Sequence, residues 1–223
     1  MKTVQPKQIT KRTWLILLVL HALACNAFGP AVEPVFTLTS EPTRTVTPTP
    51  TTIPTPTPPL DPTIYGSIKI IGTSEFIIQT RSALALLEEN DHDAFVKVQT
   101  YVGIIEQGEH SGMWSWEVPP RYEVGDPTAF YSVTWYASTI AHDATHSELY
   151  HQYAAQHPGE YVPEEVYSGV PVEQFCNLYQ LEVLKRIGAP QGEIDYLSTL
   201  DGTHCDVDND GDCDWADYQN RDW

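Results

Sequence analysis

A proline- and threonine-rich stretch divides the chain and limits where a folded domain can lie. Residues 30–63 contain 10 of the 18 prolines, together with 11 threonines. Proline has no backbone N–H and fixes φ, so such a stretch cannot complete helices or sheet ladders. We therefore interpret residues 25–63 as a disordered, extended linker. The remaining stretch of about 160 residues has the length of one domain.

The N-terminus resembles an export signal. Four Lys and Arg residues within the first 12 positions precede an apolar run over residues 14–20, which is too short to span a bilayer. We expect residues 1–24 to be a signal peptide and the protein to be secreted or extracytoplasmic. Cys25 follows a Leu-Ala pair and resembles the lipidated cysteine of bacterial lipoproteins. A lipid on Cys25 would tether the chain to the envelope, and cleavage without lipidation is the alternative.

Acidic residues dominate the part of the chain that follows the linker. From Leu60 onward, 7 Lys and Arg residues face 28 Asp and Glu residues, which gives a net charge of −21. This charge repels phosphate backbones and anionic lipid, so we expect no nucleic-acid partner and no membrane contact except through the leader or a lipid on Cys25. The same charge suits a protein that holds cations.

Hydrophobic periodicity predicts a mainly α fold, α+β with minor strand content. We expect a short strand at 64–71 and a hairpin or ordered loop at 112–125. Thr73 or Ser74 is placed to cap a helix to about residue 90, and Asp91 to cap a second helix that continues through Ile105 to Gly108. Three further helices are expected at 126–156, 171–187 and 193–200.

An Asp-rich segment near the C-terminus has the spacing of an EF-hand calcium loop. Gly211 stands at position 6 of the loop, where a sharp turn is needed. The acidic residues at positions 1, 3, 5, 7, 9 and 12 are Asp206, Asp208, Asp210, Asp212, Asp214 and Asp217. Position 7 would offer its backbone carbonyl. Since position 12 is Asp where sensor EF-hands have Glu, the segment resembles the dockerin-type calcium loops of secreted bacterial proteins. We expect residues 201–223 to bind Ca²⁺ as a structural staple.

Two histidines in the expected long helix form a second candidate metal site. His142 and His146 are four residues apart, so both imidazoles lie on one face and can reach one Zn²⁺. The stretch resembles the HExxH helix of zinc metallopeptidases, with Asp143 in place of the catalytic Glu. The gluzincin group of this family takes its third zinc ligand from a following helix, and here Glu173 is at the start of such a helix. Other candidates for the third ligand are Glu164, Glu165, His151 and His157.

The resemblance implies a helical metallopeptidase-like domain over residues 64–200 and a peptide or protein substrate. His142, His146 and Glu173 would bind Zn²⁺, and Asp143 would act as the general base on a water molecule. Asp is one methylene shorter than Glu, which removes roughly 1.5 Å of reach. A non-catalytic, calcium-stabilised extracellular binding domain with a structural His pair is the alternative.

The remaining candidates do not have a single interpretation. Cys205 and Cys213 bracket the acidic loop and can close it, but Cys176 can pair with either of them. The aromatic residues at 113–116 and Tyr122 suit either a substrate cleft or a packed core. Four tyrosines are candidates for a donor to an oxyanion: Tyr150, Tyr153, Tyr161 and Tyr167.

Overall fold

A computed structural model describes residues 61–213 and 215–220. The expected signal peptide, Cys25, nearly all of the linker, and Asp214 lie outside the described residues. The elements run in the order β1 (Ile64–Tyr65), β2 (Ile68–Ile71), α1 (Ser74–Asn90), α2 (His92–Tyr101), β3 (Ile104–Gly108), β4 (Gly112–Trp114), β5 (Arg121–Gly125), α3 (Asp126–Ala129), α4 (Val133–Gln156), the 3-10 helix η1 (Glu164–Val166), α5 (Val170–Arg186), α6 (Gln191–Leu197), the 3-10 helix η2 (Thr203–Cys205) and α7 (Trp215–Asn220). A mainly helical fold with minor strand content is confirmed.

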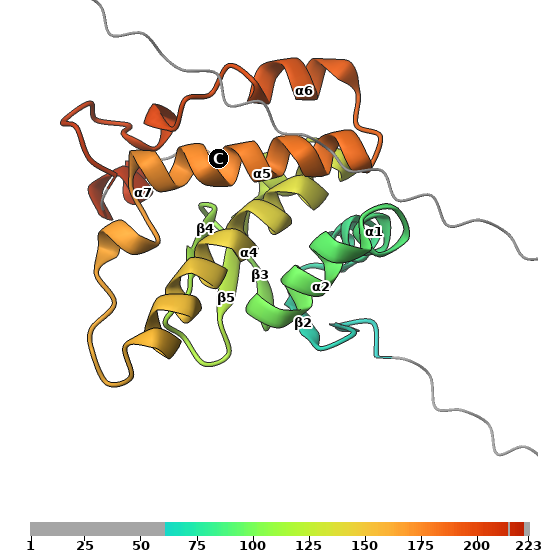
Figure 1. The fold of residues 1–223 in the computed structure, drawn as a ribbon. Coiled ribbons are helices and arrows are strands. Elements are labelled where there is room, and N and C mark those ends of the chain that lie inside the picture. The colour runs from blue at the N-terminus through green and yellow to red at the C-terminus, as the bar shows by residue number, and fades with distance from the viewer. Residues whose placement is uncertain (1–60, 214, 221–223) are drawn as a thin grey trace, which may run out of the picture. The chain divides into compact units, whose positions relative to one another are not determined.

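A five-stranded mixed sheet has the order β1-β2-β3-β5-β4. The three inner strands β2, β3 and β5 are parallel, and β1 and β4 pair antiparallel at the two edges. The parallel strands β2 and β3 are joined by α1 and α2, as a parallel pair requires a crossover. β4 is therefore an edge strand of the sheet (Figure 1).

The long helix α4 packs against α1, α2 and α5 and occupies the centre of the helical layer (Figure 1). Tyr136 and Ile140 of α4 are fully buried with Phe76 and Leu84 of α1 and Ile105 of β3. Burial of such large side chains is the main source of stability, at about 1.5–3 kcal/mol each. The core thus fixes α4, which carries the candidate zinc ligands, against the sheet and three helices.

Both of the first two helices begin at the residues that the sequence indicated. The Thr73 hydroxyl accepts a hydrogen bond from the Phe76 N–H, and an Asp91 carboxylate oxygen accepts one from the Ala94 N–H. The second oxygen of Asp91 accepts a 2.6 Å bond from Arg186 Nε. Asp91 therefore caps α2 and also ties it to the end of α5.

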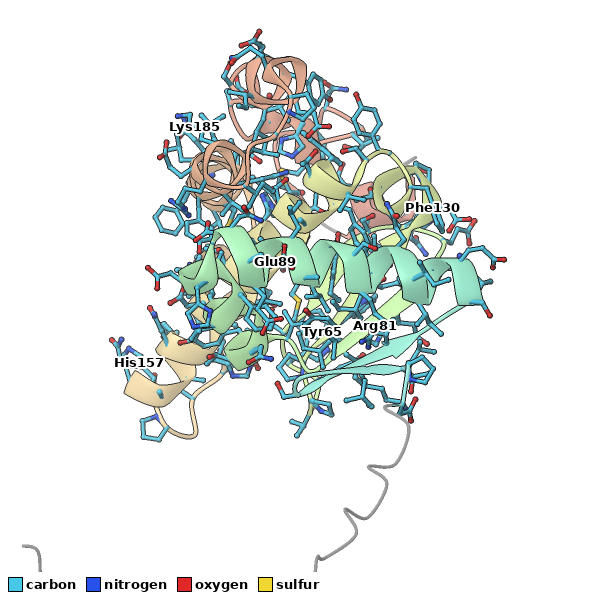
Figure 2. All side chains as sticks on the ribbon, turned by 90° about the vertical axis from the view of Figure 1, so that its right-hand side faces the viewer. Tyr65, Arg81, Glu89, Phe130, His157 and Lys185 are labelled. Atoms are coloured by element: carbon cyan, nitrogen blue, oxygen red, sulfur yellow. A yellow bond between two sulfur atoms is a disulfide. The ribbon has the colours of Figure 1, made fainter. Side chains whose placement is uncertain are left out.

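The segment expected as one strand is a tight hairpin. Gly66 between β1 and β2 has φ 59°, a conformation that glycine adopts without steric cost. The hairpin is held to α1 because the Tyr65 hydroxyl donates to Glu88 and the Arg81 guanidinium lies 5.0 Å from the Tyr65 ring centre (Figure 2).

The prediction that the second helix continues through Ile105 was wrong. The helix ends at Tyr101, and Ile104 and Ile105 lie in β3, paired with β2 and β5. A Cβ on Gly103 would fall 2.3 Å from Pro119, so only glycine allows this close approach. Ile105 is a buried apolar residue, and such a residue fits the pattern of a buried helix as well as that of a buried strand. The sequence pattern therefore did not distinguish the two.

The region expected as one helix over 126–156 is divided. Asp126 and Pro127 start only the four-residue α3. Ser132 then begins α4 by accepting a 2.9 Å hydrogen bond from the Trp135 N–H. The segment 112–125 contains the antiparallel strands β4 and β5, in agreement with the expected hairpin. Among the described residues, no helix has both the length and the apolar character needed to cross a membrane.

Candidate metal centre and cavity

Helix α4 holds His142 and His146 one turn apart with their Nε2 atoms 3.0 Å from each other. Both side chains are almost completely buried. The Nδ1 atom of His146 is 2.8 Å from the Tyr167 carbonyl oxygen. A carbonyl only accepts, so Nδ1 carries the proton and Nε2 presents its lone pair to the other groups of the site.

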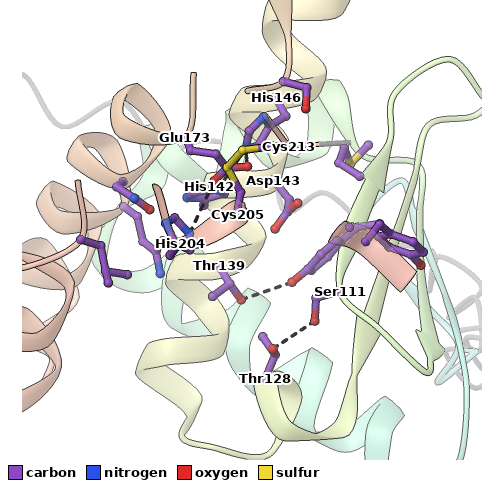
Figure 3. A pocket seen from close by; sticks show the side chains of 18 of the residues that line it. Ser111, Thr128, Thr139, His142, Asp143, His146, Glu173, His204, Cys205 and Cys213 are labelled. Carbon is purple, nitrogen blue, oxygen red and sulfur yellow. Dashed lines mark hydrogen bonds and ion pairs between the residues drawn. A yellow bond between two sulfur atoms is a disulfide. The ribbon is translucent and has the colours of Figure 1, made fainter. Parts of the chain in front are cut away.

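Glu173 lies in the first turn of α5 and faces both histidines (Figure 3). Its Oε2 atom is 3.2 Å from His142 Nε2, and its Oε1 atom is 3.5 Å from His146 Nε2. Burial alone would raise the pKa of Glu173, but His146, His142 and His204 together hold that pKa far below its usual value. A buried, ionised carboxylate therefore faces two imidazole nitrogens.

The spacing of these three groups fits a single small cation. Ligand atoms arranged tetrahedrally at 2.0–2.1 Å from zinc are about 3.3 Å from one another. The distances of 3.0, 3.2 and 3.5 Å scatter around this value. The donor set of two imidazoles and one carboxylate is also one that zinc accepts. The residues present thus fit Zn²⁺, and the open side of the group faces the cavity described below.

Of the alternative third ligands, the structure brings only Glu164 to the same cavity. His151 instead stacks on Tyr101, and His157 stacks on Tyr153. Cys176 is a buried free thiol whose sulfur lies within 4.8 Å of the ligand atoms of the two histidines. Burial, and then the charge of Glu173, raise the pKa of the Cys176 thiol, which opposes the thiolate form that binds metals.

His204 is a member of the group that the sequence interpretation missed. Its Nε2 atom lies 3.7 Å from Glu173 Oε2. His204 is in η2, directly before Cys205, which forms a disulfide with Cys213. The pairing of Cys205 with Cys213 settles the choice that the sequence left open. The only sequence signal for His204 was its position beside a half-cystine.

Asp143 lies on α4 next to His142 and lines the same cavity (Figure 3). Burial, and then the charge of the nearby Asp143, raise the pKa of the Tyr122 hydroxyl well above its usual value. The Tyr122 hydroxyl also donates a long, 3.5 Å hydrogen bond to Thr139 Oγ1. Asp143 therefore shares the cavity with the histidine pair and lies near Tyr122 of β5.

A cavity of about 710 Å³ contains the whole group. Its walls come from β4, α4, α5, α6 and the Cys205–Cys213 disulfide. Trp114 and Trp116 line it, and Tyr122 is fully buried with its ring in the core. The aromatic residues are thus divided between the two expected roles, since the tryptophans line a cavity and Tyr122 packs in the core. Of the four tyrosines considered as donors to an oxyanion, Tyr167 alone is among the lining residues that the structure describes.

The acidic loop after η2 is folded around its own carboxylates. Asp206 accepts hydrogen bonds from the backbone N–H groups of Asp210 and Gly211, both at 3.0 Å. Carboxylate oxygens of Asp206, Asp208 and Asp210 lie within 4.8 Å of one another. Partial desolvation, together with the charges of the neighbouring Asp210, Asp217 and Asp206, raises the pKa of Asp208. This crowding of negative charge is what a cation would relieve.

The other predicted calcium ligands differ in their placement. Asp217 is fully buried, and its Oδ1 atom accepts hydrogen bonds from the N–H groups of Val207 and Asp208 at 2.6 and 3.2 Å. It therefore closes the loop through backbone contacts. Asp212 is exposed, as suits a residue expected to offer only its carbonyl.

Comparisons with known proteins add no family to these observations. No protein-family model matches the chain, and no curated protein or solved structure matches it either. The assignment of function therefore rests on the geometry of the site.

Proposed function

We propose that the chain is an exported zinc peptidase, in which His142, His146 and Glu173 hold Zn²⁺ and Asp143 is the general base. One observation supports this most directly. Three side-chain groups of the kind that zinc prefers meet at 3.0–3.5 Å in a cavity, next to a further carboxylate. A structural zinc site would be enclosed by four protein ligands, whereas this group opens toward a space large enough for a substrate.

Each residue has a defined part in the proposed reaction. Zinc held by His142, His146 and Glu173 would supply a water molecule of lowered pKa and a Lewis acid for the peptide carbonyl. Asp143 accepts the proton of that water and passes it to the leaving amine. The Tyr167 carbonyl orients His146 by holding its Nδ1–H, and Tyr122 borders Asp143 from the side of the sheet.

The cavity walls favour a peptide as the substrate. Strand β4 lines the cavity and is an edge strand. Such an edge offers N–H and C=O groups to an extended peptide, which can pair with it as an additional strand. The scissile bond of a peptide lying between β4 and α4 would then face the histidine pair and Asp143.

Metal content is the deciding measurement. The full chain, purified without a histidine tag, is analysed by plasma mass spectrometry. We expect about one zinc per chain, lost in His142→Ala and reduced in the isosteric Glu173→Gln. His157→Ala is the matched control, because His157 lies outside the cavity and its side chain is 41% exposed.

A protease screen then compares the wild type with Asp143→Asn. Cleavage by the wild type alone supports the peptidase. A protein that takes up no zinc even from an excess sinks the proposal. It leaves the alternative, a binding domain in which the two histidines and Glu173 form a structural hydrogen-bonded group.

We also propose that the acidic loop binds Ca²⁺, which stabilises the fold of the loop. The backbone N–H groups directed at Asp206 and the convergence of Asp206, Asp208 and Asp210 support this. The same plasma measurement tests it, since Asp206→Ala/Asp208→Ala should lose calcium and keep zinc.

A further inference from the structure

Three aromatic rings from separate segments line the α6 side of the cavity. They belong to Tyr131 in the α3–α4 connection, Trp135 of α4 and Tyr196 of α6. The Tyr131 and Trp135 ring centres are 5.9 Å apart, and those of Trp135 and Tyr196 are 5.7 Å apart. Tyr131 is 68% exposed and Tyr196 is 57% exposed, so these two residues are not part of the hydrophobic core. We call Tyr131, Trp135 and Tyr196 the aromatic cluster.

A buried carboxylate accompanies the aromatic cluster. Glu193 precedes Tyr196 by one turn of α6 and is only 7% exposed. Its two oxygens accept 2.7 Å hydrogen bonds from Ser132 Oγ and Thr134 Oγ1. In the part of the chain that the structure describes, no Lys or Arg forms an ion pair with Glu193. The N-terminus of α4 offsets part of its charge, and buried glutamates are otherwise almost always paired with a cation.

The charged residues that line the rest of the cavity also favour a cationic ligand. Among the described lining residues there is no Lys or Arg, but there are four carboxylates: Asp143, Glu164, Glu173 and Glu193. The described lining therefore has no Lys or Arg that would receive an acidic ligand, and its basic groups are the imidazoles of His142, His146 and His204 at the metal centre. Walls of one charge sign focus the field and concentrate ions of the opposite sign. Aromatic faces beside a carboxylate attract ammonium and guanidinium groups.

The distance between the aromatic cluster and the histidine pair determines which part of a bound peptide can reach the aromatic cluster. Trp135 and His142 both line the cavity from α4 and are seven residues apart, which is about 10 Å along the helix. An extended peptide advances about 3.3 Å per residue. A long side chain that starts one or two residues from the scissile bond therefore spans the remaining distance.

We propose that the aromatic cluster and Glu193 form a subsite for a Lys or Arg side chain of the substrate, one or two residues from the bond that is cleaved. The position of this side chain rests on the proposed peptidase function. The recognition of a cation by this part of the cavity does not need catalysis, and it can be measured separately.

Binding of a matched ligand pair tests the subsite. Nα-acetyl-arginine amide and Nα-acetyl-citrulline amide have nearly the same shape, and only the first carries a charge. Their affinities are measured by calorimetry on the full chain, with zinc removed and calcium present. We expect arginine to bind about tenfold more tightly than citrulline.

Variants identify the groups responsible. Glu193→Gln keeps the hydrogen bonds to the two hydroxyls, because an amide can both accept and donate, and it should reduce arginine binding to the citrulline level. Trp135→Leu should weaken the binding of both compounds. Glu160→Gln is the control, since Glu160 has a 66% exposed side chain and lies outside the cavity. Thermal unfolding of each variant confirms that it is folded. Equal affinities for the two compounds, or a preference for arginine that survives Glu193→Gln, overturn the subsite.

Peptide cleavage separates this inference from the proposed function. A peptide series carries arginine or citrulline at each position around one bond. Selective binding of arginine without any cleavage supports the subsite and counts against the peptidase. Cleavage that is indifferent to arginine supports the peptidase and overturns the subsite. Binding of neutral oligosaccharides in preference to arginine also overturns it.

Discussion

Extending the carboxylate of Asp143 by one methylene should raise the rate of peptide cleavage. In the proposed mechanism, Asp143 must reach a water molecule held beside His142, and Asp falls roughly 1.5 Å short of the reach of Glu. Since a misplacement of about 1 Å can cost about 10²-fold in rate, we expect Asp143→Glu to raise kcat by about 10²-fold. KM should change little, because the substrate contacts elsewhere in the cavity remain.

The structure allows the longer side chain. Asp143 faces a cavity of about 710 Å³, so the added methylene enters open space. On the side of the sheet, Asp143 is bordered by Tyr122, which is fully buried, so the longer side chain would extend toward the cavity instead. The helix that carries Asp143 is fixed by the packing of Tyr136 and Ile140, so it should not shift to accommodate the change.

The assay is steady-state cleavage of a fluorogenic peptide, with zinc content measured on the same samples. Asp143→Asn should be inactive at unchanged zinc content. Asp195→Glu adds the same methylene at an exposed carboxylate outside the cavity, and it should leave the rate unchanged. If Asp143→Glu keeps its zinc but is as slow as Asp143→Asn, reach does not limit this base, and the role assigned to Asp143 is wrong.

Three further predictions concern stability. Chelation of calcium held at about 100 times its Kd should remove about 2.7 kcal/mol, which lowers Tm by about 5–10 °C, and scanning calorimetry of Asp206→Asn should show no such response. Cys205→Ser/Cys213→Ser removes a cross-link with a sequence separation of 8, and from loop-closure entropy we expect the free energy of unfolding to fall by about 2.5 kcal/mol. A wild-type Tm that does not change when reductant is added would contradict this. Asp91→Ala loses both the cap of α2 and the bond to Arg186, at about 2 kcal/mol in urea unfolding, whereas Asp91→Asn keeps the cap and should lose about half as much.

The sequence predicted best where one local rule decides the outcome. Thr73, one of the two residues expected to cap the first helix, is the residue that caps α1. Helical spacing also sufficed to place His142 beside His146. In each case the information lies within one or two turns of the chain, so no long-range contact can override it.

The sequence predicted poorly where distant contacts decide. Ile105 suits a buried helix or a buried strand equally well, and only pairing with β2 and β5 selects the strand. The contact of His204 with Glu173 joins segments that no periodicity relates. The position of Glu173 against both histidines came from a resemblance to a family, and spacing alone would not have selected it over His151 or Glu164.

The order in which the cavity walls are made has a consequence for folding in the cell. Helix α4, the disulfide and Tyr218 border one space, yet the disulfide and Tyr218 are synthesised long after α4. Contacts between such distant segments form slowly, because the intervening chain must first be ordered. The wall of the cavity that Cys205 and Cys213 form would therefore be complete only after the Cys205–Cys213 bond closes. Since disulfides form outside the reducing cytosol, an exported chain would complete this cavity only after it leaves the cytosol.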